Sequence, residues 1–137
     1  MTEPVSAGAP LLIVDDDPDD IFALKAVLGP LGRPILEAGD GDEALRLLLT
    51  HDVCLILMDL MMPRVNGFQA AALIHERGRS KQIPIIFLTG FDREEARYVP
   101  GYSPAFSEFA RKPVDPDQLR LKVEALLGKD APPRPKN

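Results

Sequence analysis

Several residue and segment types are scarce in this sequence, and each absence excludes a class of protein. Cys54 is the single cysteine among 137 residues, which excludes a disulfide framework and a metal site built from cysteines. No apolar run approaches the roughly 20 residues that span a bilayer. Residues 1–10 have neither the basic start nor the apolar stretch of a signal peptide. These features favour a cytoplasmic protein without membrane contact.

Basic residues are also in the minority. The chain has 16 Lys and Arg against 21 Asp and Glu, a formal net charge of −5. Because a nucleic-acid-binding surface needs an excess of positive charge, direct contact with DNA or RNA is not expected. The content of 45% hydrophobic and 27% charged residues is that of an ordinary globular protein. The length suits one domain, which we expect at residues 10–128, between flexible segments at 1–9 and 129–137.

Apolar runs alternate with segments of helical periodicity along the chain. The runs at 11–14, 53–58 and 83–88 are continuous, which is typical of strands buried on both faces of a parallel sheet. Residues 34–38 and 106–110 are a shorter and a weaker strand candidate. The alternation predicts an α/β fold with a five-stranded parallel sheet covered by helices. The apolar stripes of the helices are Ile21, Leu24, Val27 and Leu28; Ala44, Leu45, Leu48 and Leu49; Phe68, Ala71 and Ala72; and Leu119, Val123, Leu126 and Leu127.

Local signals mark the ends of the first and last helices. Asp17 followed by Pro18 predicts an N-cap and a first helical residue. Gly29 and Pro30 predict the end of that helix, and Gly128 predicts the end of the last one.

Polar side chains stand at the ends of four predicted strands. They are Asp15 and Asp16 after 11–14, Asp59 after 53–58, Thr89 after 83–88 and Lys112 after the last strand. Because the carboxyl ends of parallel strands lie at the same edge of a sheet, we expect these side chains to meet in one site. Each residue taken singly also suits a cap, a turn or a solvated charge, but the four strand ends together favour a shared site.

The residue types in this set suit phosphoryl transfer. Carboxylates that lie close together repel one another, and Mg2+, which prefers oxygen ligands, removes that conflict. Asp16 and Asp59 are the candidate ligands. The hydroxyl of Thr89 and the ammonium of Lys112 can hold phosphoryl oxygens beside the metal. A carboxylate in this position can itself accept the group as an aspartyl phosphate.

Other acidic or phosphate-binding motifs do not fit. An EF-hand loop starting at Asp15 would need Gly at its sixth position and Glu at its twelfth, where the chain has Asp20 and Ala26. The sequence contains no Walker A motif and no GxGxxG motif after a strand.

From residue 10 to about residue 128 the chain resembles the receiver domain of response regulators in two-component signalling. The motifs that carry the resemblance are Leu-Leu-Ile-Val-Asp-Asp-Asp at 11–17, Met-Asp-Leu-Met-Met-Pro-Arg-Val-Asn-Gly at 58–67, Phe-Leu-Thr-Gly at 87–90 and Lys-Pro at 112–113. Their order and spacing match the family. The resemblance implies a flavodoxin-like, doubly wound sheet with strand order 2-1-3-4-5.

The resemblance also implies a role for each residue at the acidic end of the site. Asp59 looks like the phosphoacceptor. Asp15 and Asp16 look like the acidic pair that holds Mg2+ together with Asp59, and the backbone carbonyl of Met61 completes the protein ligands. Lys112 looks like the ammonium that binds the phosphoryl group, with a cis bond to the proline that follows it.

Three further roles follow from the same resemblance. Thr89 looks like the switch hydroxyl, and Phe109 like the aromatic side chain that moves when the hydroxyl turns inward. Met61 and Phe91 stand two residues after Asp59 and Thr89, where they flank the path of the hydrolytic water. Both are apolar and cannot orient a water by hydrogen bonding, so slow dephosphorylation is expected.

The implied partner is a histidine kinase or a histidine phosphotransfer protein that presents a phosphohistidine. The chain then works as a phosphorelay receiver, which catalyses its own phosphorylation and dephosphorylation and is not otherwise an enzyme. Phosphorylation is expected to change a protein-binding face. The sequence does not name the downstream target, and homodimerisation is one expected use of that face.

One segment departs from the family pattern. A fourth helix can begin at 92–97, but Pro100, Gly101 and Pro104 follow closely. We predict that the helix ends by about Val99 and that 100–104 forms an irregular loop. Ala105-Phe106 replaces the usual Gly-Ala before the last strand, so an unusual output face is expected.

Three other interpretations stay open at this point. The chain can be a receiver module of a larger regulator or hybrid kinase, rather than a stand-alone receiver. A magnesium-dependent phosphatase that forms an aspartyl phosphate usually has a second acid two residues after its nucleophile, where this chain has Met61. A degenerate receiver that binds partners without phosphate is the third interpretation, and the complete acidic set with Thr89 and Lys112 argues against it.

Overall fold

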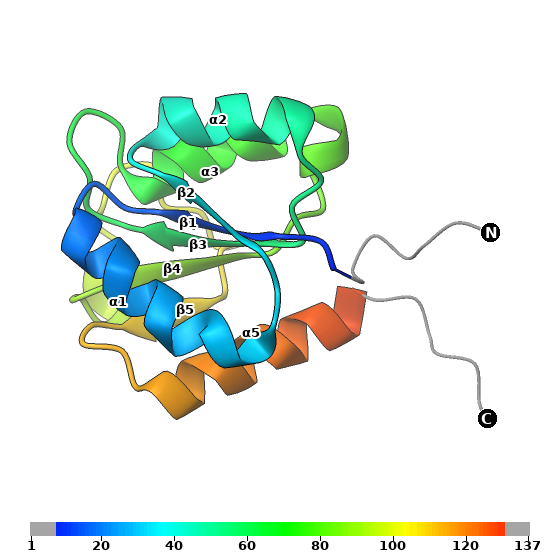
Figure 1. The fold of residues 1–137 in the computed structure, drawn as a ribbon. Helices are drawn as coiled ribbons and strands as arrows, with labels where there is room; N and C mark the ends of the chain where they lie inside the picture. The colour runs from blue at the N-terminus through cyan, green and yellow to red at the C-terminus, as the bar shows by residue number, and fades with distance from the viewer. Residues whose placement is uncertain (1–7, 131–137) are drawn as a thin grey trace.

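Five parallel strands form the central sheet of the structure, a computed structural model that describes residues 8–130. The strands are β1 (Leu11–Val14), β2 (Ile35–Ala38), β3 (Leu55–Asp59), β4 (Ile85–Thr89) and β5 (Phe109–Arg111). Their order in the sheet is β2-β1-β3-β4-β5 (Figure 1), which confirms the predicted flavodoxin-like topology. The register pairs Val14 with Met58 and Asp59 with Leu88. The carboxyl ends of β1, β3 and β4 therefore lie next to one another.

Helices cover both faces of the sheet. Figure 1 shows α2 (Gly41–Thr50) and α3 (Gly67–His75) on one face, and α1 (Pro18–Leu28) and α5 (Pro116–Asp130) on the other. The 3-10 turns η1 (Gly29–Leu31) and η2 (Gly78–Ser80) follow α1 and α3. The remaining helix, α4 (Arg93–Ala96), is a single turn.

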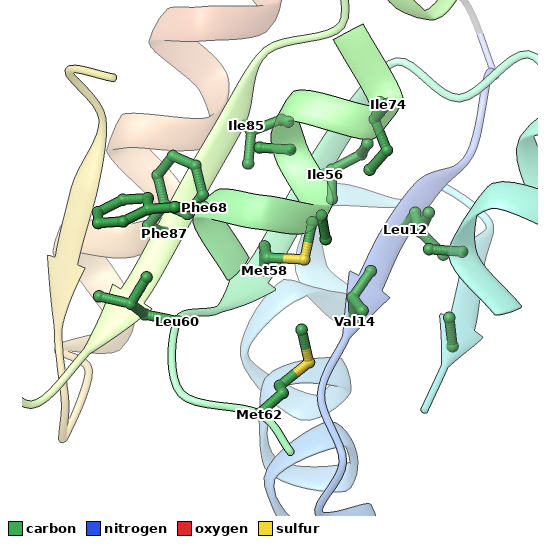
Figure 2. Close-up of a cluster of buried hydrophobic side chains, with 14 of the residues drawn as sticks. Leu12, Val14, Ile56, Met58, Leu60, Met62, Phe68, Ile74, Ile85 and Phe87 are labelled. Carbon is green, nitrogen blue, oxygen red and sulfur yellow. The ribbon is translucent and has the colours of Figure 1, made fainter. Parts of the chain in front are cut away.

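Side chains alternate between the two faces along each strand and build two cores. Val14 and Met58 point towards α2 and α3, where Phe68 lies among them (Figure 2). Ile13 and Leu57 point the other way and pack against α1 and α5. Burying one such aliphatic or aromatic side chain stabilises the fold by about 1.5–3 kcal/mol. Because both faces are covered, both sets must be apolar, which explains the continuous hydrophobic runs of the sequence.

The first helix begins where the sequence predicts. Asp17 caps α1 by accepting a hydrogen bond from the Asp19 N–H, and Pro18 is the first helical residue. The predicted end of the last helix is wrong, because α5 continues through Gly128 to Asp130. A glycine inside a helix costs only about 1 kcal/mol, which the buried face of α5 outweighs. Most of the two predicted flexible segments, residues 1–7 and 131–137, lies outside the described residues.

The segment between α4 and β5 has the predicted irregular form. Helix α4 ends at Ala96, and tighter turns follow, in which the Val99 N–H donates to the Ala96 carbonyl. Residues 100–104 form a loop, as expected. The predicted start of β5 at residue 106 is wrong, because the strand begins at Phe109. The ring of Phe106 instead stacks on Phe68, with ring centroids 5.2 Å apart.

This loop packs against the start of α3. The side-chain amide of Asn66 donates a hydrogen bond of 2.9 Å to the Pro100 carbonyl, and the ring of Tyr102 meets Phe68 edge-on at 5.8 Å. Gly101 has a φ of +90°, and a Cβ atom there would lie 3.1 Å from the Gln69 Cγ and 3.2 Å from the Phe68 Cβ. Both the backbone conformation and the close approach therefore favour glycine at this position.

We expect Gly101→Ala to lower the free energy of unfolding by about 1–3 kcal/mol, because the alanine must adopt a left-handed backbone against a packed helix. Urea denaturation followed by circular dichroism measures the change. The matched control is Gly128→Ala, since Gly128 lies in α5 with open space around its Cβ position. This control should raise stability by about 0.5–1 kcal/mol. Equal stability of wild type and Gly101→Ala would contradict the packing of this loop.

Candidate functional site

The four predicted strand ends meet at the carboxyl edge of the sheet. Asp15 follows β1, Asp59 is the last residue of β3 and Lys112 follows β5. One carboxylate oxygen from each of Asp15, Asp16 and Asp59 lies within 4.8 Å of the others. The Lys112 Nζ lies 2.9 Å from Asp59 Oδ1 and 3.6 Å from Asp15 Oδ2. The predicted site is therefore one cluster of three carboxylates and an ammonium group.

Backbone contacts hold these side chains in place. The Asp17 N–H donates to Asp15 Oδ1 at 2.9 Å, which orients the Asp15 carboxylate. The peptide bond between Lys112 and Pro113 is cis, as expected. Gly67 starts α3 directly against the end of β3, and a Cβ atom there would lie 2.6 Å from the Asp59 carbonyl oxygen. The close packing of α3 on the phosphoacceptor candidate therefore needs glycine at this position.

The charges of the cluster are buried to different degrees. Asp15 is 1% exposed, and burial raises its pKa to about 6, although the Asp17 N–H bond acts in the opposite direction. Burial also raises the pKa of Asp59, against the effect of its hydrogen bond from Lys112. Burial lowers the pKa of Lys112, but the hydrogen bond and charge of Asp59 outweigh it, so that the net pKa is raised. The ammonium therefore stays charged beside two carboxyl groups that resist ionisation.

One oxygen of Asp15 is left without a hydrogen bond. Asp15 Oδ2 is buried and has no hydrogen-bond partner among the described residues. An unsatisfied buried oxygen costs free energy, so native proteins usually give it a partner. The Lys112 Nζ lies 3.6 Å from this oxygen, and carboxylates of Asp16 and Asp59 lie near the Asp15 carboxylate, an arrangement of oxygens that suits a hard cation.

Thr89 and Phe109 lie on neighbouring strands beside the cluster. Thr89 is buried at the end of β4, and its Oγ1 accepts a hydrogen bond of 2.9 Å from the Phe91 N–H. The Thr89 carbonyl accepts from the Lys112 N–H, which ties the switch candidate to the lysine. The half-buried ring of Phe109 packs against Phe87 at 5.6 Å, and the guanidinium of Arg93 lies 5.2 Å from its centroid.

The two residues expected to tune hydrolysis differ in exposure. Met61 is 54% exposed at the start of the loop after β3. Phe91 is half-buried and packs against the core on the α3 side of the sheet.

The sequence interpretation missed one residue of the cluster. Asp20, in the first turn of α1, places Oδ2 3.3 Å from the Lys112 Nζ. Its position in the sequence could have indicated that Asp20 lies near the site, because an acid three residues after the N-cap Asp17 lies at the same edge of the sheet as the end of β1. That signal does not tell which side chain Asp20 meets, because Lys112 is 92 residues away.

Residues 11–124 match the family of response regulator receiver domains. The chain is 34% identical over 119 residues to protein PilH of Pseudomonas aeruginosa, which covers 87% of this chain and 98% of PilH. It is 38% identical over 117 residues to the transcriptional regulatory protein SrrA of Staphylococcus aureus, covering 85% of this chain and 47% of SrrA. The chain thus spans nearly all of PilH and about half of SrrA.

Solved structures show the same likeness. The receiver domain of the sensor histidine kinase PA1611 of Pseudomonas aeruginosa has a TM-score of 0.80 and 26% identity, covering 89% of this chain and 99% of that domain. In that structure a magnesium ion is coordinated in the active-site cleft. The receiver domain of a histidine kinase from Syntrophus aciditrophicus has a TM-score of 0.78 and 26% identity, covering 94% of this chain and 97% of that one.

The chain belongs to the response regulator receiver domain family. It is a phosphoacceptor receiver of two-component signalling and not a conventional enzyme, which confirms the interpretation of its motifs. Membership implies a histidine kinase as partner. Among the described residues, no helix combines the length and the apolar character needed to cross a bilayer.

We expect Asp15→Asn to stabilise the metal-free protein at neutral pH. The folded state binds the Asp15 proton more tightly than the unfolded chain, since the pKa rises from 3.8 to about 6. The stability from this proton is therefore present below pH 3.8 and is lost as the pH rises through about 6. Removing the charge should give a gain on the order of 2 kcal/mol at about pH 7, which shrinks towards about pH 4.

Urea denaturation in the presence of a chelator, repeated across this pH range, measures the gain. Asp42→Asn, which neutralises an exposed acid in the first turn of α2, serves as control and should show no gain that grows with pH. A gain for Asp15→Asn that is the same at both ends of the range would contradict the assigned effect of burial.

Proposed function

We propose that Asp59 takes the phosphoryl group from a phosphohistidine of a histidine kinase or a histidine phosphotransfer protein. The observation that carries this assignment is the position of Asp59 between the Lys112 ammonium, 2.9 Å away, and the carboxylates of Asp15 and Asp16. Asp59 makes the shortest carboxylate contact with the Lys112 ammonium, and one of its oxygens also lies within 4.8 Å of an oxygen of each acid of the pair. A group bound to it is therefore flanked by an ammonium and by a metal-binding acidic pair.

Asp15, Asp16 and Asp59 are the residues that would hold Mg2+, together with the backbone carbonyl of Met61. The three carboxylate oxygens within 4.8 Å of one another, and an Asp15 Oδ2 that accepts no hydrogen bond from the described residues, fit a small hard cation. The magnesium ion in the cleft of the PA1611 receiver supports the assignment. When bound, the ion offsets the negative charge that gathers where the phosphoryl group and the carboxylates meet. Asp16 is the exposed member and Asp15 the buried one, which suits direct binding by Asp16 and an orienting role for Asp15.

The transfer itself needs a carboxylate oxygen in line with the phosphorus. An oxygen of Asp59 attacks the phosphorus, the P–N bond of the phosphohistidine breaks, and its electron pair returns to the imidazole. The product on Asp59 is an acyl phosphate. Lys112 then holds a phosphoryl oxygen in place of Asp59 Oδ1, and its positive charge favours the more negative phosphorylated state.

The switch uses the two residues beside the cluster. Thr89 turns its hydroxyl towards a phosphoryl oxygen and gives up the hydrogen bond from the Phe91 N–H. Phe109 moves into the space that Thr89 leaves. Because Arg93 lies over the Phe109 ring and also donates to the Ser107 carbonyl, this movement reaches α4 and the segment before β5. The downstream target is another protein, or a second copy of the chain, that binds this altered face. The chain itself acts in the cytoplasm.

Asp59→Asn should abolish phosphorylation by a small phosphodonor in the presence of Mg2+, because the amide lacks a nucleophilic carboxylate oxygen. Intact mass spectrometry should show the gain of one phosphoryl group for wild type and none for the variant. Asp42→Asn, which removes an acid from the same chain outside the cluster, should label like wild type. Labelling of Asp59→Asn at the wild-type level would overturn the assignment of the phosphoacceptor.

Met61 and Phe91 should make the phosphorylated form long-lived, because neither side chain can position a water for attack on the phosphorus. We expect the double variant Met61→Asn/Phe91→Glu to lose its phosphoryl group several-fold faster than wild type. The decay is followed by intact mass after the donor is removed. Leu73→Asn, an exposed apolar residue of α3, controls for the loss of surface hydrophobicity and should leave the decay unchanged. Equal decay of wild type and the double variant would show that shielding does not set the lifetime.

A further inference from the structure

We propose that Asp20 is a positioning residue for Lys112, an assignment that rests on the proposed function of Asp59. Asp20 lies in the first turn of α1, and its Oδ2 is 3.3 Å from the Lys112 Nζ. The ammonium therefore contacts carboxylates that come from two strand ends and from a helix. Asp15 and Asp59 come from the buried ends of β1 and β3, and Asp20 comes from α1, with a side chain 45% exposed.

The carboxylates that contact Lys112 differ in whether they are candidate metal ligands. Asp15 and Asp59 are candidate metal ligands, so their charge is shared with any bound cation. Asp20 is outside the set of three oxygens that lie within 4.8 Å of one another. Its negative charge therefore stays available to the ammonium when the cluster holds a divalent ion.

This difference affects the free energy of cation binding. An ion at the cluster brings two positive charges close to the Lys112 ammonium, which repels them. If Asp59 and Asp15 were the only partners of Lys112, the cation would compete with the ammonium for the same oxygens. Asp20 gives the ammonium a hydrogen-bond acceptor that is not one of the three clustered oxygens, so that Lys112 can share Asp59 with the cation instead of competing for it.

The neighbouring residue offers a matched control. Asp19 lies in the same turn of α1, is exposed and carries the same charge. Among the described residues, the carboxylates within 4.0 Å of the Lys112 Nζ are those of Asp15, Asp20 and Asp59. Asp19→Asn and Asp20→Asn therefore remove equal charge from the helix N-terminus, and only the second removes a contact with the lysine.

The test is the dissociation constant of Mg2+ for the full chain, measured by titration calorimetry without any phosphodonor. Asp20→Asn should raise the constant about threefold, the factor that corresponds to a partly exposed ion pair. Asp19→Asn should change it by less than about 1.5-fold, the residual effect of a screened charge. Asp20→Glu, which keeps a carboxylate within reach of the lysine, should restore most of the affinity.

The role through Lys112 is tested by repeating both substitutions in a Lys112→Met background. There the effect of Asp20→Asn should fall to that of Asp19→Asn. Equal effects of the two single substitutions, or an undiminished effect of Asp20→Asn without the lysine, would overturn the positioning role. If Lys112→Met does not fold, equal effects of the two single substitutions still overturn the role.

The same measurement separates this inference from the function on which it rests. A wild-type chain that binds no Mg2+ would contradict the proposed cluster itself. A wild-type chain that binds Mg2+ and is phosphorylated, while Asp20→Asn and Asp19→Asn behave alike, would overturn the role of Asp20 alone.

Discussion

Two carboxylates buried beside a single ammonium group are the constraint on which the rest of the structure depends. Asp15 and Asp59 are both largely removed from water, and Lys112 supplies one positive charge between them. These two buried carboxylates outnumber the one ammonium that contacts both of them, and burial raises the pKa of both acids. That imbalance favours any state that adds positive charge at the site, a property that suits a metal-dependent phosphoacceptor.

The scaffold holds this unfavourable cluster by packing its surroundings tightly. Gly67 brings the start of α3 against the Asp59 carbonyl, and the hydrogen bond from the Asp17 N–H orients Asp15. On the other side of the same helix start, Asn66 binds the Pro100 carbonyl. The β3–α3 connection that follows Asp59 is thus tied directly to the irregular segment before β5. This irregular segment therefore stands where a regular fourth helix would continue, and it packs on the start of α3.

Much of the site could be predicted because its residues follow strands whose ends are marked in the sequence. The apolar run before Asp59 and the run before Thr89 are continuous, and parallel strands align their carboxyl ends. The weaker predictions concern segments where packing competes with local preference. Phe106 is a residue type that favours strands, but it lies before β5 begins, and its ring stacks on Phe68. Gly128 is typical of a helix end, but packing of the buried face of α5 stabilises the helix beyond this residue, to Asp130.

The sequence by itself determined the class of fold, the edge of the sheet that carries the site and the chemistry of that site. These properties depend on periodicity and on the residue at each strand end, which are local in the chain. Only the tertiary structure decided which charges meet across that edge. The contact between Asp20 and Lys112 and the docking of Gly101 on α3 join segments far apart in sequence. Spacing along the chain does not encode such distances, because they are set by how closely separate helices and strands pack.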